Sequence, residues 1–255
     1  MLIKKTGSPV WALAILFTTA LGVGGLVLEA GAAEQSPTLR EQLAEKAAEA
    51  KAKAPDDRAK IMQNAIDDLR KQNIIKKAKN VGAKIPSFSL PDAKRGIVKS
   101  KDLLGKPLII VFYRGGWCPY CNLQLRDLQK HLPEIKAAGA ELVAISPEAP
   151  DRSLETVKKN DLGFYVLSDA GGKVSKKFGL VFELPKDLQK LYGDFGIDLP
   201  KHNQSKKWEL PLGASYVVDS KGKITYAFLE ADYKLRAETT DLIAEVQKLA
   251  PKRVK

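Results

Sequence analysis

The spacing of apolar positions changes from helical to strand-like near residue 80 of the chain. Before that point, residues 34–79 place apolar side chains three and four positions apart among Glu and Lys, which predicts helices throughout. Pro55 and the two aspartates after it end one helix and begin the next, because acidic side chains are favourable at a helix N-terminus. We therefore expect a helical extension over residues 33–80.

Beyond residue 80, short apolar runs alternate with helical patterns. Strands are expected at residues 107–113, 141–146, 164–168, 214–219 and 223–229. Helices are expected up to about residue 138, at 154–160 and around residues 242–249. Strand–helix–strand units followed by a hairpin and a helix predict an α/β domain over residues 81–250, with a central mixed sheet flanked by helices. Residues 180–210 are expected to be an insertion, and residues 251–255 a basic tail.

The first 32 residues have the pattern of a secretory signal peptide. Lys4 and Lys5 precede an uncharged apolar run over residues 10–28, and small residues follow it. That run approaches the ~20 residues that span a bilayer, so an uncleaved membrane anchor is the alternative. We expect an exported protein, periplasmic or secreted, that contacts a membrane only through this segment if it stays uncleaved.

Composition places the full chain among ordinary globular proteins. It is 44% hydrophobic and 28% charged, which excludes collagen-like and wholly disordered chains. The excess of 42 Lys and Arg over 30 Asp and Glu, a net charge of +12, raises the question of nucleic acid binding. The basic residues are scattered among acids, with no basic helix and no basic stripe interleaved with aromatics, so no nucleic acid partner is expected.

Both cysteines of the chain, Cys118 and Cys121, lie between the strand expected at 107–113 and the helix that follows it. Free backbone N–H groups at a helix start stabilise a thiolate and lower a cysteine pKa. Cys121 begins an apolar stripe that continues through Leu125 and Leu128, so we expect it to face the core and Cys118 to be more exposed. The position of this C-x-x-C pair predicts a redox-active dithiol.

Other interpretations of the cysteine pair are a structural disulfide and a zinc site. Zinc requires two further ligands, and besides carboxylates the chain offers only His131 and His202, without motif spacing. No glycine-rich nucleotide-binding motif is present, so neither a metal nor a flavin or nucleotide cofactor is expected.

Several separated segments carry a family resemblance. VFYRGGWCPYCNLQLRDLQ, GAELVAISPE (139–148), VLSDAGG (166–172) and residues 208–236 resemble the peroxiredoxin-like branch of the alkyl hydroperoxide reductase/thiol-specific antioxidant family, in the same order. The resemblance covers about residues 80–250. It implies a thioredoxin-like fold and a thiol-dependent peroxidase for hydrogen peroxide or organic hydroperoxides, reduced by a thioredoxin-like dithiol protein.

The same resemblance implies two assignments for the cysteines. Peroxiredoxins place the peroxidatic cysteine in P-x-x-x-T-x-x-C after the first buried strand. In that frame Cys121 is the peroxidatic cysteine, with Cys118 in place of the threonine and Arg114 in place of the proline. A thioredoxin-type assignment makes Cys118 the nucleophile of a thiol–disulfide oxidoreductase and Cys121 its resolving partner. A non-catalytic thioredoxin-like binding domain is the third hypothesis.

The substrate-binding positions depart from the family pattern. Thioredoxin-like proteins have a cis-proline, and peroxiredoxins an arginine nearby, where this chain has Gly213 with Pro211 before it. Arg114 or Arg236 could supply the missing positive charge, although we expect Arg236 to be a surface cation. Trp117 offers an aromatic flank for substrate docking or for packing against the neighbouring loop.

Overall fold

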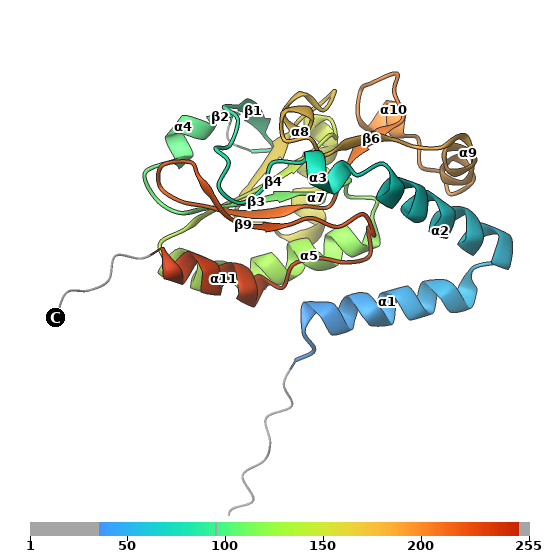
Figure 1. Cartoon of the computed structure of the whole chain (residues 1–255), viewed down its shortest axis with the longest axis horizontal. Coiled ribbons are helices and arrows are strands. Elements are labelled where there is room, and N and C mark those ends of the chain that lie inside the picture. Colours follow the sequence, from blue (N-terminus) through green and yellow to red (C-terminus); the bar gives the residue numbers. More distant parts are fainter. Residues whose placement is uncertain (1–35, 95, 250–255) are drawn as a thin grey trace, which may run out of the picture. The chain divides into compact units, whose positions relative to one another are not determined.

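The apolar run after Pro107 forms the strand β3 of a seven-stranded mixed sheet in the computed structural model, which describes residues 36–94 and 96–249 (Figure 1). The strand order is β2-β1-β5-β4-β3-β8-β9. The strands are β1 (Ser89–Asp92), β2 (Gly96–Lys99), β3 (Leu108–Phe112), β4 (Glu141–Ser146), β5 (Tyr165–Ser168), β8 (Ser215–Val218) and β9 (Ile224–Phe228). β3 pairs in parallel with β4 and antiparallel with β8, and every residue of β3 is buried. A strand that is apolar on both faces requires cover on both, which the helices provide.

All five strands predicted from the sequence are present, each within one or two residues of its expected bounds. The hairpin of β1 and β2 was not predicted. Each of its strands is four residues long and β1 contains Pro91, so neither shows the alternation that identifies a strand.

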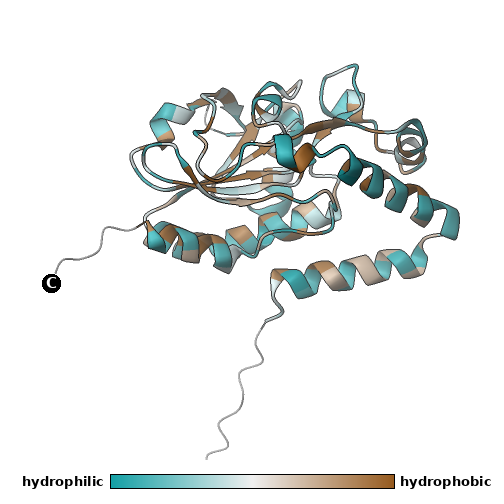
Figure 2. Ribbon diagram, viewed as in Figure 1, coloured by the Kyte–Doolittle hydropathy of each residue, from teal (hydrophilic) through white to brown (hydrophobic). Residues whose placement is uncertain are grey.

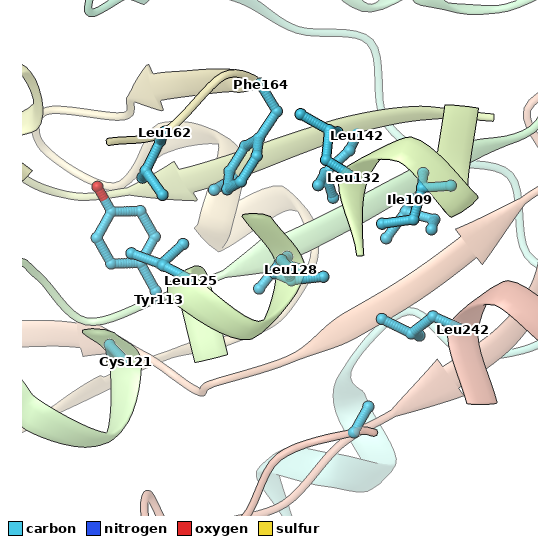
Figure 3. Packing of buried hydrophobic residues seen from close by; sticks show 14 of the residues in the cluster. Ile109, Tyr113, Cys121, Leu125, Leu128, Leu132, Leu142, Leu162, Phe164 and Leu242 are labelled. Carbon is cyan, nitrogen blue, oxygen red and sulfur yellow. The ribbon is translucent and has the colours of Figure 1, made fainter. Parts of the chain in front are cut away.

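Helices cover the two faces of the sheet with separate cores. One core joins the sheet to α1 (Leu39–Lys53), α5 (Pro119–Lys130), α6 (Leu132–Ala137), α7 (Pro150–Asn160) and α11 (Thr239–Lys248) (Figure 3). The other core joins the opposite face to α2 (Asp56–Lys71), α3 (Ile74–Lys77), α4 (Ser100–Leu103) and α8 (Lys173–Lys177). The expectation of a central mixed sheet flanked by helices is confirmed.

The predicted extension contains the two helices α1 and α2. A capping box between Thr38 and Glu41 begins α1, and Pro55 is the residue that precedes α2. Both helices are largely hydrophilic (Figure 2), and α1 attaches to the domain through Leu39 and Leu43, which are buried in the core that includes α5. The described residues from Pro37 onward form one compact unit.

The insertion expected at residues 180–210 builds a small layer of its own. β6 (Val181–Glu183) and β7 (Glu209–Pro211) pair antiparallel as a second sheet, and α9 (Lys186–Asp194) and α10 (Leu199–His202) lie between them in sequence. α9 packs against α2, and the two share a third apolar cluster that includes Trp117. The extension and the insertion therefore meet beside the cysteine loop.

The predicted signal peptide, residues 1–32, and the predicted basic tail, residues 251–255, lie outside the described residues. Within the part of the chain that the structure describes, no helix combines the length and apolarity that crossing a membrane requires.

A test of the extension is Leu43→Ala. The side chain is 4% exposed and packs with α5, so truncation leaves a cavity, and we expect the free energy of unfolding to fall by about 3 kcal/mol. Urea unfolding followed by circular dichroism measures the change, with Glu45→Ala on the exposed side of α1 as the control. An unchanged unfolding midpoint for Leu43→Ala would show that α1 does not unfold cooperatively with the domain.

Candidate functional site

Both cysteines lie at the start of α5, as the sequence predicts. Cys118 is the residue that precedes the helix, Pro119 is its first residue and Cys121 lies in its first turn. Cys121 begins the buried side of α5, followed by Leu125 and Leu128 (Figure 3). The predicted exposure of Cys118 is wrong, because its exposed fraction is 1% and that of Cys121 is 0%. Helical phase identifies the side of α5 that faces the sheet, but it carries no information on what covers the helix start.

The loop before α5 depends on its two glycines. Gly115 has φ of +151°, and a Cβ there would lie 2.3 Å from Trp117 Nε1. A Cβ at Gly116 would lie 2.0 Å from Thr156 Oγ1 on α7. Neither position has room for a side chain, so the glycines allow the cysteine loop to pack directly against its neighbours.

Arg236 contacts the sulfur of Cys121. Its Nη2 lies 3.3 Å from Cys121 Sγ, and its Nη1 donates to the carbonyl oxygens of Tyr233 and Leu235, each at 2.6 Å. The expectation that Arg236 is a surface cation is wrong, because only 6% of the residue is exposed. A turn closed by the Leu235 N–H on the Asp232 carbonyl redirects the chain after β9, which brings Arg236 to the start of α5.

Arg114 supplies a second buried guanidinium. Its Cζ lies 4.5 Å from the ring centroid of Tyr233, 5.3 Å from that of Trp117 and 5.7 Å from that of Tyr192. It also donates a hydrogen bond to the Tyr192 hydroxyl. Aromatic faces attract a guanidinium, so these three rings hold Arg114 beside the dithiol.

The two thiols differ in their pKa values. Burial raises the pKa of Cys121, but a hydrogen bond from Cys118 and the charges of Arg236 and Arg114 outweigh it and hold that pKa well below its usual range. Burial and the hydrogen bond to Cys121 both raise the pKa of Cys118 well above its usual range. The site therefore favours a thiolate at Cys121 and a protonated thiol at Cys118.

Gly213 lies under the guanidinium of Arg236. A Cβ on Gly213 would lie 2.7 Å from Arg236 Cζ. Gly213, which the sequence suggests as a substrate-binding position, thus lies beside Cys121 and Arg236. Because it has no side chain, it leaves the space that the Arg236 guanidinium occupies. Pro211 lies two residues earlier, in β7.

Trp117 packs between the cysteine loop and the insertion. Its ring meets that of Tyr192 edge-on, with centroids 5.6 Å apart, and it contacts both the core that includes α5 and the cluster shared by α2 and α9. Of the two interpretations of Trp117, the structure shows the packing contact.

Glu148, which sequence reasoning missed, lies below the glycine loop. Its Oε2 accepts a hydrogen bond from the Gly116 N–H at 2.9 Å, and its Oε1 lies 3.7 Å from His202 Nδ1. Burial raises the pKa of Glu148 to about 7, and the negative charge of Cys121 adds to the increase. Tyr192 and Tyr233 were missed as well. A single carboxylate after a strand, a tyrosine in α9 and a tyrosine in a distant loop carry no spacing signal in the sequence.

The contacts of His131 and His202 are with oxygen atoms of other residues, not with the cysteine sulfurs. His131 Nδ1 lies 2.9 Å from the carbonyl oxygen of Asp127 at the end of α5, whereas His202 faces Glu148. Among the residues that the structure describes, no three His, Cys, Asp or Glu side chains are grouped to hold a metal ion.

Comparison with known proteins identifies the family. The model of the AhpC/TSA family matches residues 81–227, more than half of the chain. The chain belongs to the AhpC/TSA family.

Its relatives in this family are peroxiredoxins. It is 32% identical to the chloroplastic peroxiredoxin Q of Populus jackii over 145 residues, 57% of this chain and 58% of that one. Identity to the chloroplastic peroxiredoxin Q of Sedum lineare is 31% over 160 residues, 63% of this chain and 74% of that one. Identity to peroxiredoxin Bcp of Escherichia coli K12 is 28% over 143 residues, which are 56% of this chain and 81% of that one. The chain thus spans under two thirds of the length of the Populus relative.

Solved structures show the same fold. Peroxidoxin BcpB of Mycobacterium tuberculosis matches with a TM-score of 0.53 and 18% identity, covering 68% of this chain and 99% of its own. AhpC of Enterococcus faecalis matches with a TM-score of 0.52 and 17% identity, covering 67% of this chain and 92% of its own. The predicted thioredoxin-like fold is confirmed.

The part of the chain that matches the AhpC/TSA family does not contain the whole site. Residues 81–227 include both cysteines, Arg114 and Gly213, but they end before Arg236. They also begin after α1 and α2. The arginine that contacts Cys121 and the helix α2 that packs beside the site therefore lie outside the matched segment.

Gly213→Ala tests the contact between Arg236 and Cys121. The added methyl group overlaps the end of a flexible side chain, so we expect the protein to fold, Arg236 to move away and the pKa of Cys121 to rise. The pH dependence of alkylation by iodoacetamide, measured in Cys118→Ser protein, reports that pKa. A parallel Gly193→Ala variant, where a Cβ meets no atom, serves as the control. An unchanged profile in Gly213→Ala would contradict the role of Arg236.

Glu148→Gln tests the buried carboxyl. An unfolded Glu titrates near pH 4.3, whereas folded Glu148 titrates near pH 7. Between those values the folded state keeps a proton that the unfolded state has lost, so the stability that Glu148 contributes falls as pH rises and is constant above about pH 7. Relative to the wild type, we expect Glu148→Gln to gain up to roughly 3 kcal/mol between pH 4 and pH 8. Urea unfolding across this pH range measures the free energy of unfolding of both proteins. If the wild type and Glu148→Gln depended on pH in the same way, the raised pKa of Glu148 would be contradicted.

Proposed function

We propose that this protein is a thiol-dependent peroxidase in which Cys121 attacks the peroxide. The observation that carries the proposal is the contact of Arg236 Nη2 with Cys121 Sγ at 3.3 Å in a buried site. Membership of the AhpC/TSA family and relatives named as peroxiredoxins support it.

The reaction begins at the ionised sulfur. The Cys121 thiolate attacks one oxygen of the peroxide and the O–O bond breaks, which leaves a sulfenic acid on Cys121 and an alkoxide or hydroxide that takes up a proton. The guanidinium groups of Arg236 and Arg114 stabilise the thiolate before attack and the negative oxygen as it leaves. Because the donors are fixed in a buried site, they act without reorganising solvent.

Cys118 is placed to resolve the sulfenic acid. Burial and its hydrogen bond to Cys121 raise the pKa of Cys118, so its thiol stays protonated while Cys121 is a thiolate. Its sulfur attacks the sulfenic sulfur, so that a disulfide forms and water leaves. A thioredoxin-like dithiol protein then returns both cysteines to thiols.

The geometry favours this assignment over thiol–disulfide exchange. An oxidoreductase that attacks protein disulfides through Cys118 requires that sulfur at the surface and as a thiolate. Cys118 is 1% exposed, and burial raises its pKa. Both properties oppose attack on a large substrate by Cys118.

The site of action is part of the same proposal. The basic, apolar and small-residue pattern of residues 1–32 supports export to the periplasm or beyond, with an uncleaved anchor as the alternative. In an oxidising compartment the dithiol depends on a dedicated reductant to stay reduced.

Single-turnover oxidation by hydrogen peroxide tests the cysteine roles. Cys121→Ser should not consume peroxide, whereas Cys118→Ser should consume one equivalent and stop at a sulfenic acid that dimedone traps. Intact-protein mass spectrometry distinguishes the products, and the wild type should end as an internal disulfide. Peroxide consumption that is lost with Cys118→Ser and retained with Cys121→Ser would reverse the assignment. An inert wild type would refute the peroxidase.

A further inference from the structure

Glu148 is a buried acid that the proposed reaction does not use. It lies two residues after the end of β4 and is 2% exposed, and it is the only buried glutamate among the residues that the structure describes. The parallel pairing of β3 with β4 brings the ends of these two strands together. The carboxyl of Glu148 therefore lies against the loop that leads from β3 to the cysteines.

Both oxygens of the carboxyl contact the backbone of this loop. The Gly116 N–H donates a hydrogen bond to Oε2 at 2.9 Å, and a Cβ on Gly115 would lie 2.9 Å from Oε1. The Cys118 N–H in turn donates to the Gly115 carbonyl oxygen at 3.1 Å. Glu148 thus supports the part of the loop that carries Cys118.

The two buried acids of the site, Cys121 and Glu148, do not share their cations equally. The positive charges of Arg236 and Arg114 act on the Cys121 thiolate. Among the described residues, no Lys or Arg forms an ion pair with Glu148. Like charges repel strongly in a buried site. The arrangement therefore favours a negative charge on Cys121 and a neutral carboxyl on Glu148.

The surroundings of Glu148 make its protonation sensitive to the state of Cys121. Burial raises the pKa of Glu148 to about 7, the hydrogen bond from Gly116 opposes that increase, and the charge of Cys121 adds to it. The other titratable or charged groups that face Glu148 are Tyr113 of β3, Arg152 and Glu155 of α7, and His202 of α10. Of all these groups, only Cys121 changes its charge in the proposed reaction.

His202 connects the carboxyl to solvent. Its Nδ1 is buried, lies 3.7 Å from Glu148 Oε1 and has no hydrogen-bond partner among the described residues. The side chain as a whole is 22% exposed. Burial lowers the pKa of His202, so the imidazole is neutral near pH 7. A neutral imidazole that faces a carboxyl on one side and reaches solvent on another is suited to pass a proton between them.

We propose that Glu148 stores a proton while Cys121 is a thiolate and releases it through His202 once the peroxide has removed the charge of Cys121. The inference rests on the proposed peroxidase function. In that reaction the Cys121 thiolate, the Cys118 thiol, one hydrogen peroxide and one proton give a disulfide and two waters, and the proton goes to the leaving hydroxide. The proton that Glu148 releases balances this uptake. The buried site therefore keeps one negative charge before and after oxidation.

Counting protons during oxidation provides the test. Reduced full-length protein is mixed with one equivalent of hydrogen peroxide in weakly buffered solution slightly below pH 7, with an indicator dye to follow proton uptake. We expect the wild type to take up clearly less than one proton per disulfide, because Glu148 supplies the rest. Glu148→Gln has no proton to release and should take up one. Glu134→Gln, at an exposed glutamate of α6, is the matched control and should behave as the wild type does.

A second measurement needs no variant. Infrared difference spectra between the reduced and the oxidised wild type, labelled with carboxyl-¹³C glutamate, report the loss of a neutral glutamic acid and the gain of a carboxylate. The isotope shift identifies a glutamate, and Glu148 is the only buried one in the described part of the chain. Oxidation by diamide, which forms the disulfide without a peroxide, is run in parallel.

The outcomes separate the role of Glu148 from the peroxidase. Equal proton uptake by the wild type and Glu148→Gln, or difference spectra without a glutamic acid band, would overturn the role of Glu148 and leave the peroxidase standing. A wild type that hydrogen peroxide does not oxidise would overturn the proposed function, and the spectra with diamide would then decide the role of Glu148 alone. A glutamic acid band that is lost with both oxidants, together with the smaller proton uptake of the wild type, establishes the inference.

Discussion

The site depends on keeping one ionised sulfur out of water. A buried charge is costly unless it is paired and hydrogen-bonded. Cys121 is fully buried, and Arg236 and Arg114 provide the positive charge that compensates its thiolate. The surroundings serve that pairing, since Gly213 leaves room for the guanidinium of Arg236 and two backbone carbonyl oxygens hold it in position.

The site is enclosed by two helices that lie far apart in the sequence. The sheet places the C-terminal end of β3 and the start of α5 together. Here α2 and α9 share an apolar cluster beside it, and Tyr192 of α9 binds Arg114. Excluding water strengthens every charge interaction at the dithiol.

Sequence reasoning succeeds where the signal is local. The buried runs at β3, β4 and β5 and the stripe beginning at Cys121 follow from apolar periodicity, and the structure has each of them. It fails at Arg236, which meets Cys121 across 115 residues of sequence and lies in an irregular segment without a period. Glu148 is similar, because its contact with Gly116 depends on two loops that only the parallel pairing of β3 and β4 brings together.

The question of which cysteine reacts first shows why composition and spacing are insufficient. Both sulfurs lie at the start of α5, so the partial positive charge of its N-terminus favours an anion at either. The asymmetry arises from partners placed by the tertiary fold, since Arg236 contacts Cys121, and Cys118 keeps its proton and donates a hydrogen bond to that thiolate. Once one sulfur is ionised, its charge raises the pKa of the other. A small difference in placement is thereby amplified into a division of roles, and that division belongs to the pair rather than to either residue alone.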